Sequence, residues 1–367
     1  MNIFAPRRTP LHFITFLLSL SSCVSLEASS PLPHIVYILV DDFGYGNVGY
    51  HRNGSSDPAF KEVVTPAIDS LAATGIILSR HYAFQYCSPT RSALQTGRNP
   101  VYVNVLNSDP LQHNPNDPIS GFAAVPRNMT GLAAKLKMAG YKTHMAGKWH
   151  IGMATTDHIP VGRGYDTSLG YFAAANDYWD ETPDASVAHC PGIGAMTDLW
   201  LTSGPAHGLN NSRECSQSNQ SSGCVYEDDL FRESILKTIA AHDPATPLFA
   251  FIAWHNCHVP LQVPQAYVDK FAFINNSDRA LYAAKANYMD DNTGAVIDAL
   301  RAAGLYNNSI IVLTSDNGGP LANANNFPLS KSAVAAACSR PRVTHYSTIN
   351  TCTPPRPESP PPPCRGR

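Results

Sequence analysis

Residues 34–42 of this 367-residue chain read HIVYILVDD, and the rest of the architecture can be built outward from them. Residues 34–40 are almost all apolar or β-branched, which is typical of a strand buried on both faces. Such strands belong to parallel sheets that helices cover on both sides. Two further runs, LFAFIAW at 248–254 and SIIVLT at 309–314, have the same character. Together the three runs predict the centre of a mostly parallel sheet.

Helix signals separate these runs. Thr65 followed by Pro66 is typical of a helix start, with the threonine as N-cap, and Gly75 marks the end of that helix. Apolar residues at helical spacing predict a long helix over 282–300. The alternation indicates an α/β fold with a mostly parallel central sheet flanked by helices. Further expected elements are a helix over 130–139 and short strands over 76–78 and 141–146.

The composition supports a large buried core and excludes some partners. Hydrophobic residues make up 44% of the chain and charged residues 15%, which argues against global disorder. The formal net charge is −2. Since there is no basic excess, neither nucleic acid nor an anionic membrane surface is expected as a partner. The oligomeric state is not indicated.

Residues 1–28 have the pattern of a secretory signal peptide. Arg7 and Arg8 supply positive charge, residues 11–20 are mostly apolar, and small residues follow. The apolar run is shorter than a membrane span requires, so no membrane attachment is expected after cleavage. An uncleaved anchor is the alternative.

Six Asn-x-Ser/Thr sequons indicate the same secretory route. The expected destination is the lysosome or the cell exterior, where cysteines can pair. We expect a local bridge among Cys190, Cys215 and Cys224, whose connectivity the spacing leaves open. The sequons lie at Asn53, Asn128, Asn210, Asn219, Asn275 and Asn307.

Two segments break the alternation of strands and helices. Residues 183–224 are polar and rich in Ser, Asn and Gly, which predicts a long surface insertion. Residues 330–367 lose the apolar periodicity and end in a proline-rich stretch that favours extended, unpacked structure. We therefore expect one catalytic domain over 33–329 and a disordered tail after it.

Carboxylates follow two of the predicted strands directly. Asp41 and Asp42 follow the first run, and Asp316 and Asn317 follow the last. Because the carboxyl ends of parallel strands share one edge of the sheet, these oxygens are expected to lie together. Carboxylate and amide oxygens suit Ca²⁺ or Mg²⁺. The alternative for an isolated acidic pair, a solvated loop, is weaker when two pairs follow buried strands.

The segment CSPTRSALQTGR at residues 87–98 resembles the signature of the sulfatase family. In that family the cysteine is oxidised to a formylglycine aldehyde by a formylglycine-generating enzyme, and the aldehyde hydrate attacks sulfur. The resemblance implies that Cys87 is the precursor of the nucleophile. It also implies that Arg91, one helical turn later, stabilises the ionised hydrate. The alternatives are a disulfide cysteine and a surface arginine.

Two later segments resemble the same family. Residues 140–152 carry the pattern GYxTxxxGKWHxG, which implies that Lys148 holds sulfate oxygens and that His150 bonds the hydrate. The segment HNCHVPLQVP at 255–264 implies that His258 contacts sulfate and protonates the leaving alcohol. His255 and His144 are expected to be structural.

The resemblance runs in the family's order from Pro33 to Leu329 and is closest to the arylsulfatase B-like branch of the alkaline-phosphatase-like superfamily. It implies a sulfuric ester hydrolase acting on aryl sulfates or sulfated sugars such as N-acetylgalactosamine 4-sulfate. The implied metal is Ca²⁺, with Mg²⁺ as an alternative. Its implied ligands are Asp41, Asp42, Asp316, Asn317 and the modified Cys87.

The sequence departs from the family after Leu329. The family places a further sulfate-binding lysine near this point, and Lys331 lies too early to be assigned that role. The family's later strands and smaller C-terminal domain are also missing from the pattern, which indicates a truncated product. Two alternatives stay open: an inactive homologue, and a phosphodiesterase or phosphonate hydrolase of the same superfamily.

Overall fold

The computed structural model describes residues 31–52, 58–103, 124–183, 196–207, 214–221 and 223–319. The chain divides after Pro31, and the description concerns the unit that begins at Leu32. The expected signal peptide over 1–28 and the expected tail over 330–367 lie outside the described residues.

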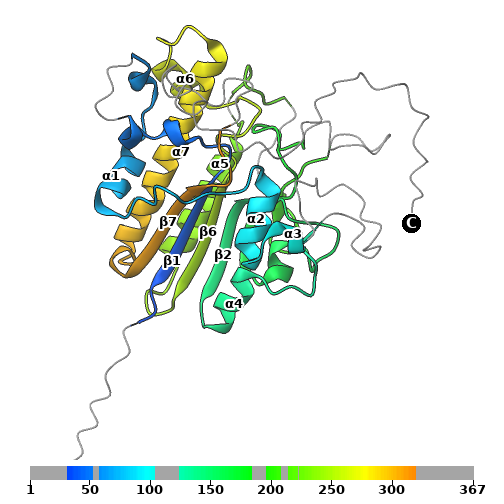
Figure 1. Ribbon diagram of the computed structural model, residues 1–367. Helices are drawn as coiled ribbons and strands as arrows, with labels where there is room; N and C mark the ends of the chain where they lie inside the picture. Colours follow the sequence, from blue (N-terminus) through cyan, green and yellow to red (C-terminus); the bar gives the residue numbers. More distant parts are fainter. Residues whose placement is uncertain are drawn as a thin grey trace, which may run out of the picture. The chain divides into compact units, whose positions relative to one another are not determined.

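A seven-stranded sheet forms the centre of this unit, in the order β5-β4-β3-β2-β6-β1-β7. Figure 1 shows β2, β6, β1 and β7 side by side. The five strands from β3 to β7 in that order run parallel, and β4 and β5 add an antiparallel edge. The expected mostly parallel α/β sheet is therefore confirmed. The strands are β1 (His34–Val40), β2 (Lys142–Lys148), β3 (Thr167–Tyr171), β4 (Trp200–Leu201), β5 (Gly204–Pro205), β6 (Leu248–Trp254) and β7 (Ser309–Ser315).

Helices connect the strands and pack against both faces of the sheet. None of those in the described part has the length and apolar character needed to cross a membrane. The α-helices are α1 (Pro66–Thr74), α2 (Cys87–Thr96), α3 (Pro100–Val103), α4 (Leu132–Met138), α5 (Glu227–Ala240), α6 (Gln265–Lys270) and α7 (Ser277–Ala302). Short 3₁₀ turns occur at Tyr45–Asn47, Gly49–His51, Pro58–Glu62, Pro160–Arg163 and Tyr306–Asn308.

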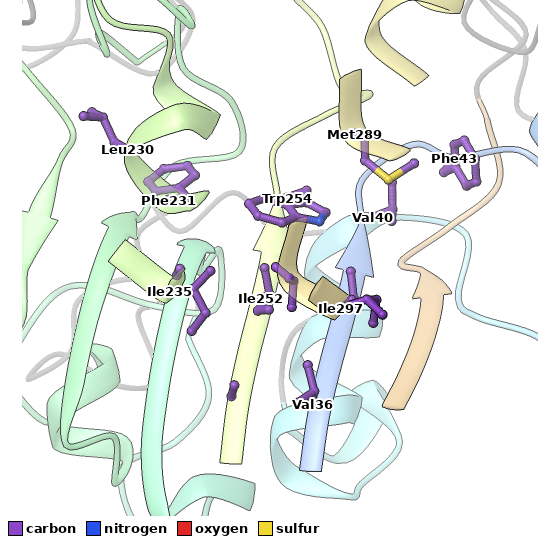
Figure 2. Packing of buried hydrophobic residues seen from close by; sticks show 14 of the residues in the cluster. Val36, Val40, Phe43, Leu230, Phe231, Ile235, Ile252, Trp254, Met289 and Ile297 are labelled. Carbon is purple, nitrogen blue, oxygen red and sulfur yellow. The ribbon is translucent and has the colours of Figure 1, made fainter. Parts of the chain in front are cut away.

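The two faces of the sheet bury alternate residues of each central strand. Val36 and Val40 of β1 and Ile252 of β6 lie in one apolar cluster with residues of α5 and α7 (Figure 2). Leu39 of β1 and Phe251 of β6 lie in a second cluster with residues of α4 and the loops around it. This period of two explains why the central strands read as continuous apolar runs.

One expected strand does not form. Residues 76–78 follow α1 as irregular backbone, and Ile76, Ile77 and Leu78 are 89%, 49% and 67% exposed. Their β-branched composition favours a strand only where a neighbouring strand offers hydrogen bonds, and none does so among the described residues. The prediction of a strand at this position is wrong for the described structure.

The other predicted helices and strands form, and they differ from the prediction mainly in where they begin and end. The long helix begins five residues earlier than expected, because the side chain of Asn276 accepts a hydrogen bond from the Arg279 amide and caps α7. Strand β2 continues to Lys148. Within the polar segment 183–224, a disulfide joins Cys215 and Cys224, which confirms a local bridge; Cys190 lies outside the described residues.

The start of α1 is capped from another helix. Thr65 occupies the N-cap position as expected, but its hydroxyl donates to Asp69 Oδ1 instead of capping the backbone. The carboxylate of Asp290 on α7 accepts hydrogen bonds from the amides of Ala67 and Ile68, at 2.9 and 2.8 Å. This contact ties α1 to α7.

Candidate active site

Four neighbouring parallel strands deliver polar residues to the same edge of the sheet. Asp41 follows β1, Lys148 ends β2, and Asp316 follows β7, while the loop after β6 carries His258. Backbone hydrogen bonds continue past the strand ends, from the Cys257 amide to Asp41 O at 2.7 Å and from the Asp316 amide to Val40 O at 3.0 Å. The edge predicted from the sequence is therefore formed, and ligands of open α/β sheets bind at such edges.

A glycine allows two of these strands to approach each other. Gly147 of β2 has φ of +103°, and a Cβ atom there would lie 1.9 Å from the carbonyl oxygen of Ala253 on β6. No other residue fits this position, so the glycine sets the distance between Lys148 and the loop after β6.

Arg91 joins the ends of three strands. Its Nε and Nη2 donate to Asp316 Oδ2 at 3.0 and 2.8 Å, and Nη2 lies 3.3 Å from Asp41 Oδ2. Its Nη1 donates to the carbonyl oxygen of Lys148 at 3.1 Å. The guanidinium is buried, and two of its nitrogens donate to the same oxygen of Asp316, which fixes its orientation. The side chain predicted to face Cys87 thus lies within the carboxylate cluster.

Lys148 supplies the second buried cation. Its Nζ donates to Asp41 Oδ2, and both side chains are fully buried. Burial alone would raise the pKa of Asp41, but the charges of Lys148 and Arg91 outweigh it and hold that pKa below its ordinary value. Asp41 is therefore ionised at neutral pH.

Nearby positive charge offsets burial less completely at the other two carboxylates. Burial and the charge of Asp41 raise the pKa of Asp42 to about 7 and that of Asp316 to about 6. The amide of Asn317 donates to Asp42 Oδ1 at 2.6 Å. Its own Oδ1 is buried and has no hydrogen-bond partner within the described ranges.

These oxygens fit a hard divalent cation. Three mutually repelling carboxylates and one buried amide oxygen without a partner are the donor set that Ca²⁺ or Mg²⁺ takes. Ligand atoms of Asp41, Asp42, Cys87 and His258 also lie within 4.8 Å of one another. A bound cation would relieve the repulsion that raises the carboxylate pKa values.

Cys87 is the first residue of α2 and faces the carboxylates. Its Sγ donates to Asp41 Oδ1 at 3.3 Å, and it takes part in no disulfide. Burial and the charge of Asp316 raise the pKa of the thiol well above its usual value. An unmodified Cys87 is therefore a neutral thiol and a weak nucleophile.

His150 and His258 form the other side of the site. Burial and Lys148 lower the pKa of His150 well below its usual value and that of His258 to about 3. His258 Nδ1 lies 2.8 Å from the carbonyl oxygen of Val259, and its Nε2 lies 3.7 Å from Asp42 Oδ2. Both nitrogens of His150 are buried without a partner in the part of the chain that is described.

The two histidines expected to be structural, His255 and His144, have supporting positions. His255 Nδ1 bonds Glu227 Oε2 at 2.7 Å, and its ring stacks on Tyr178 at 3.9 Å. His144, within β2, bonds Thr167 Oγ1 of the next strand at 2.8 Å. Neither belongs to the cluster of possible ligand atoms.

Sequence patterns missed Lys285, which contacts the backbone of the His258 loop. It lies on the buried face of α7, three residues after Tyr282 and four before Met289. A lysine within the apolar stripe of a predicted helix is the signal that could have found it, because buried lysines need partners.

The mostly parallel sheet and its solved neighbours place this chain in the class of alkaline-phosphatase-like α/β proteins. Within that class it belongs to the sulfatase family, whose model, described as "Sulfatase", matches residues 33–343.

Individual relatives agree with that assignment. Arylsulfatase J of Mus musculus is 35% identical over 82% of this chain and 45% of its own length. N-acetylgalactosamine-6-sulfatase of Mus musculus is 29% identical over 84% of this chain and 55% of its own length. The crystal structure of Ps i-CgsB in complex with k-i-k-neocarrahexaose superimposes with a TM-score of 0.65 at 29% identity, covering 82% of this chain and 62% of that one. The chain spans about half the length of the curated relatives it matches.

Proposed function

We propose that this protein hydrolyses sulfate esters through a formylglycine derived from Cys87, with a divalent metal bound beside it. The observation that carries the proposal is the position of Cys87. It begins a helix whose Arg91 is fixed by Asp316, and its sulfur contacts Asp41 in a member of the sulfatase family. A thiol with a raised pKa suits modification better than direct attack.

The carboxylate cluster would hold the metal. Asp41, Asp42, Asp316 and Asn317 are the proposed protein ligands, with the modified residue 87 beside them. We favour Ca²⁺, and Mg²⁺ suits the same oxygens. When bound, the ion supplies positive charge for the ionised hydrate and for a sulfate oxygen. Arg91 and Lys148 add fixed positive charge for the same oxygens.

The two hydroxyls of the formylglycine hydrate perform the two steps. One hydroxyl attacks sulfur, and the S–O bond to the alcohol breaks. The second hydroxyl then loses its proton with the help of His150, the aldehyde C=O forms again, and sulfate leaves. A serine could perform the first step but has no second hydroxyl for the elimination.

His258 is the proposed donor of a proton to the leaving alcohol. Its Nε2 lies on the site side, because its Nδ1 is bonded to the Val259 carbonyl. With a pKa of about 3 the ring is neutral before substrate binds. The negative charge of a bound sulfate ester would raise this pKa and so favour the protonated ring.

The proposed substrate class is a sulfated sugar, with aryl sulfates as artificial substrates. Relatives named N-acetylgalactosamine-6-sulfatase and a neighbour bound to k-i-k-neocarrahexaose support this class. N-acetylgalactosamine 4-sulfate is the specific sugar implied by the branch resemblance.

Processing in the secretory pathway is part of the proposal. Cys87 is only 9% exposed, so a formylglycine-generating enzyme would need to act before the chain folds. Four of the sequon asparagines are exposed, which suits a glycoprotein of the lysosome or the exterior; they are Asn128, Asn219, Asn275 and Asn307.

The test is expression of the full chain in secretory cells that contain the modifying enzyme. Mass spectrometry of the peptide with residue 87 should show formylglycine, and an aryl sulfate should be turned over. Cys87→Ala should abolish turnover, and EDTA should suppress it until Ca²⁺ is restored. An unmodified cysteine together with no turnover would reject the proposal.

A second candidate is a homologue that binds metal or sulfated sugar without turnover, because the carboxylate cluster alone could hold the metal. Formylglycine at residue 87 without turnover would support it. Faster cleavage of a phosphate diester than of an aryl sulfate would instead indicate a phosphodiesterase of the same superfamily.

A further inference from the structure

Lys285 is a buried lysine with no surface exposed to solvent. Its Nζ donates hydrogen bonds to the carbonyl oxygens of His258 and Pro260, at 2.6 and 2.8 Å. The ammonium group also lies 3.8 Å from the centre of the Tyr178 ring. Its direct partners are thus two backbone carbonyl groups of the loop after β6 and the aromatic ring of Tyr178.

This arrangement is costly for a lysine. Burial lowers the pKa of Lys285 to about 7, although the nearby Cys257 and Asp228 favour its charged form. A methionine has nearly the same length and would fill the space without this desolvation penalty. What methionine would lack is a donor for the two carbonyl groups.

Those two carbonyl groups flank the residue that orients His258. They belong to His258 and Pro260, and the carbonyl of Val259 between them accepts the hydrogen bond from His258 Nδ1. A donor that bridges both sides restricts rotation of the Val259 peptide groups. The direction of the imidazole follows from that restriction.

A second side chain acts on the same loop. The hydroxyl of Tyr178 lies 2.8 Å from the carbonyl oxygen of His255 and 2.9 Å from that of His258. The His258 carbonyl therefore has two donors, one from α7 and one from the segment after β3. Of these two side chains, Lys285 also donates to the Pro260 carbonyl beyond Val259, which accepts a further hydrogen bond from the Gln262 amide at 2.9 Å.

We propose that Lys285 is a positioning residue for His258. By bridging the carbonyls on either side of Val259, it holds the Val259 oxygen against Nδ1 and keeps Nε2 on the side of Asp42. The inference rests on the proposed role of His258 as the proton donor in sulfate ester hydrolysis. Lys285 itself touches neither the proposed metal ligands nor the substrate.

The test compares Lys285→Met with Lys270→Met in the full-length, modified protein. Lys270 on α6 is half-exposed and contacts Asn287, away from the loop. The substrates are 4-nitrophenyl sulfate, whose leaving group needs no proton, and a sugar sulfate, whose leaving group does. K285M should lower kcat for the sugar sulfate about a hundredfold with KM unchanged, and by only a few-fold for the aryl sulfate. K270M should leave both reactions unchanged.

Lys285→Gln adds a rescue arm. Its amide can donate to one of the two carbonyls, so it should recover part of the sugar sulfate rate, and it keeps a polar group if K285M fails to fold. Equal losses on both substrates, or a loss confined to KM, would mean a general structural role and overturn the inference.

A measurement without turnover separates this inference from the proposed function. In protein labelled with ¹⁵N-histidine, the imidazole signals of His258 are those that disappear in His258→Gln. They should shift or broaden in K285M and stay in place in K270M. If the wild type shows no sulfatase activity, the proposed function fails while these signals still decide the role of Lys285. Unchanged His258 signals in K285M would overturn the positioning role of Lys285.

Discussion

The two sides of the site are buried alike and yet differ in charge. On the carboxylate side, formed by Asp41, Asp42, Asp316 and Asn317, Arg91 and Lys148 lie within hydrogen-bond distance and keep Asp41 ionised. On the histidine side, formed by His150 and His258, the same depth leaves both rings neutral. Burial therefore removes charge wherever nearby fixed charges do not outweigh the cost of desolvation.

One residue acts on both sides with opposite results. The ammonium group of Lys148 lowers the pKa of Asp41 and also lowers the pKa of His258. The first effect favours an ion, and the second favours a neutral ring. A single buried cation thus helps to keep one side ionised and the other neutral.

The largest effect should appear when one variant from each side is compared on two substrates, of which only one has a leaving group that needs a proton. His258→Gln should lower turnover of a sugar sulfate about 10²- to 10⁴-fold and turnover of 4-nitrophenyl sulfate much less, because only the sugar alcohol needs a proton. Asn317→Ala, on the carboxylate side, should lower both rates by similar factors. Steady-state kinetics on the two substrates measures this, and equal ratios for the two variants would contradict the division.

Breaking the charge balance of the carboxylate side should cost stability. Arg91→Met leaves two buried carboxylates short of a partner, and we expect a loss of about 3–5 kcal/mol in the free energy of unfolding. Arg301→Met removes an exposed ion pair with Asp298 and should change little. Urea unfolding without divalent metal compares them. A similar loss in both variants would count against the role of buried charge.

Each side also has its own buried lysine, and they should respond differently to pH. Partner charges raise the pKa of Lys148 despite its burial, whereas burial lowers the pKa of Lys285 from 10.5 to about 7. Between the folded pKa of Lys285, about 7, and its unfolded pKa of 10.5, the unfolded chain binds a proton at this residue that the folded chain does not. The free energy of unfolding should therefore rise with pH by up to about 1.4 kcal/mol per unit relative to Lys285→Met. Urea midpoints at pH 7.5, 8.5 and 9.5 test the slope; parallel curves would refute it.

The smallest effect should come from a contact that supports α1 without entering either side. Asp290→Ala removes the acceptor for the amides of Ala67 and Ile68 and should cost about 1–2 kcal/mol. The ratio of rates on the two substrates should stay at the wild-type value. A changed ratio would show that α1 and the site are coupled more closely than the contacts indicate.

The sequence predicted the strands that lie at the centre of the sheet because burial on both faces leaves a continuous apolar run. It did not reveal β3, whose sequence TSLGY is short and partly polar. It did not reveal α5 either, which begins with three acidic residues after a polar segment. Residues 76–78 have strand composition, but composition does not supply a partner strand.

For the site, motifs next to strand ends predicted which side chains meet, because parallel strands share an edge. They could not predict the supports behind them. Lys285 contacts His258 across 27 positions of sequence, and Arg91 contacts Asp316 across 225. Such contacts depend on how the helices pack against the sheet, which local sequence patterns do not encode.

Helix α7 contacts both sides of the site. Tyr282 donates to the carbonyl oxygen of Asp42 at 3.0 Å, Lys285 holds the loop of His258, and Asp290 caps α1. Each residue of an α-helix turns the chain by about 100°, so one deletion between Tyr282 and Asp290 would swing one group of contacts away from its partners. The length of this short span is therefore fixed by its contacts. It should tolerate substitutions far more readily than the insertion or deletion of a residue.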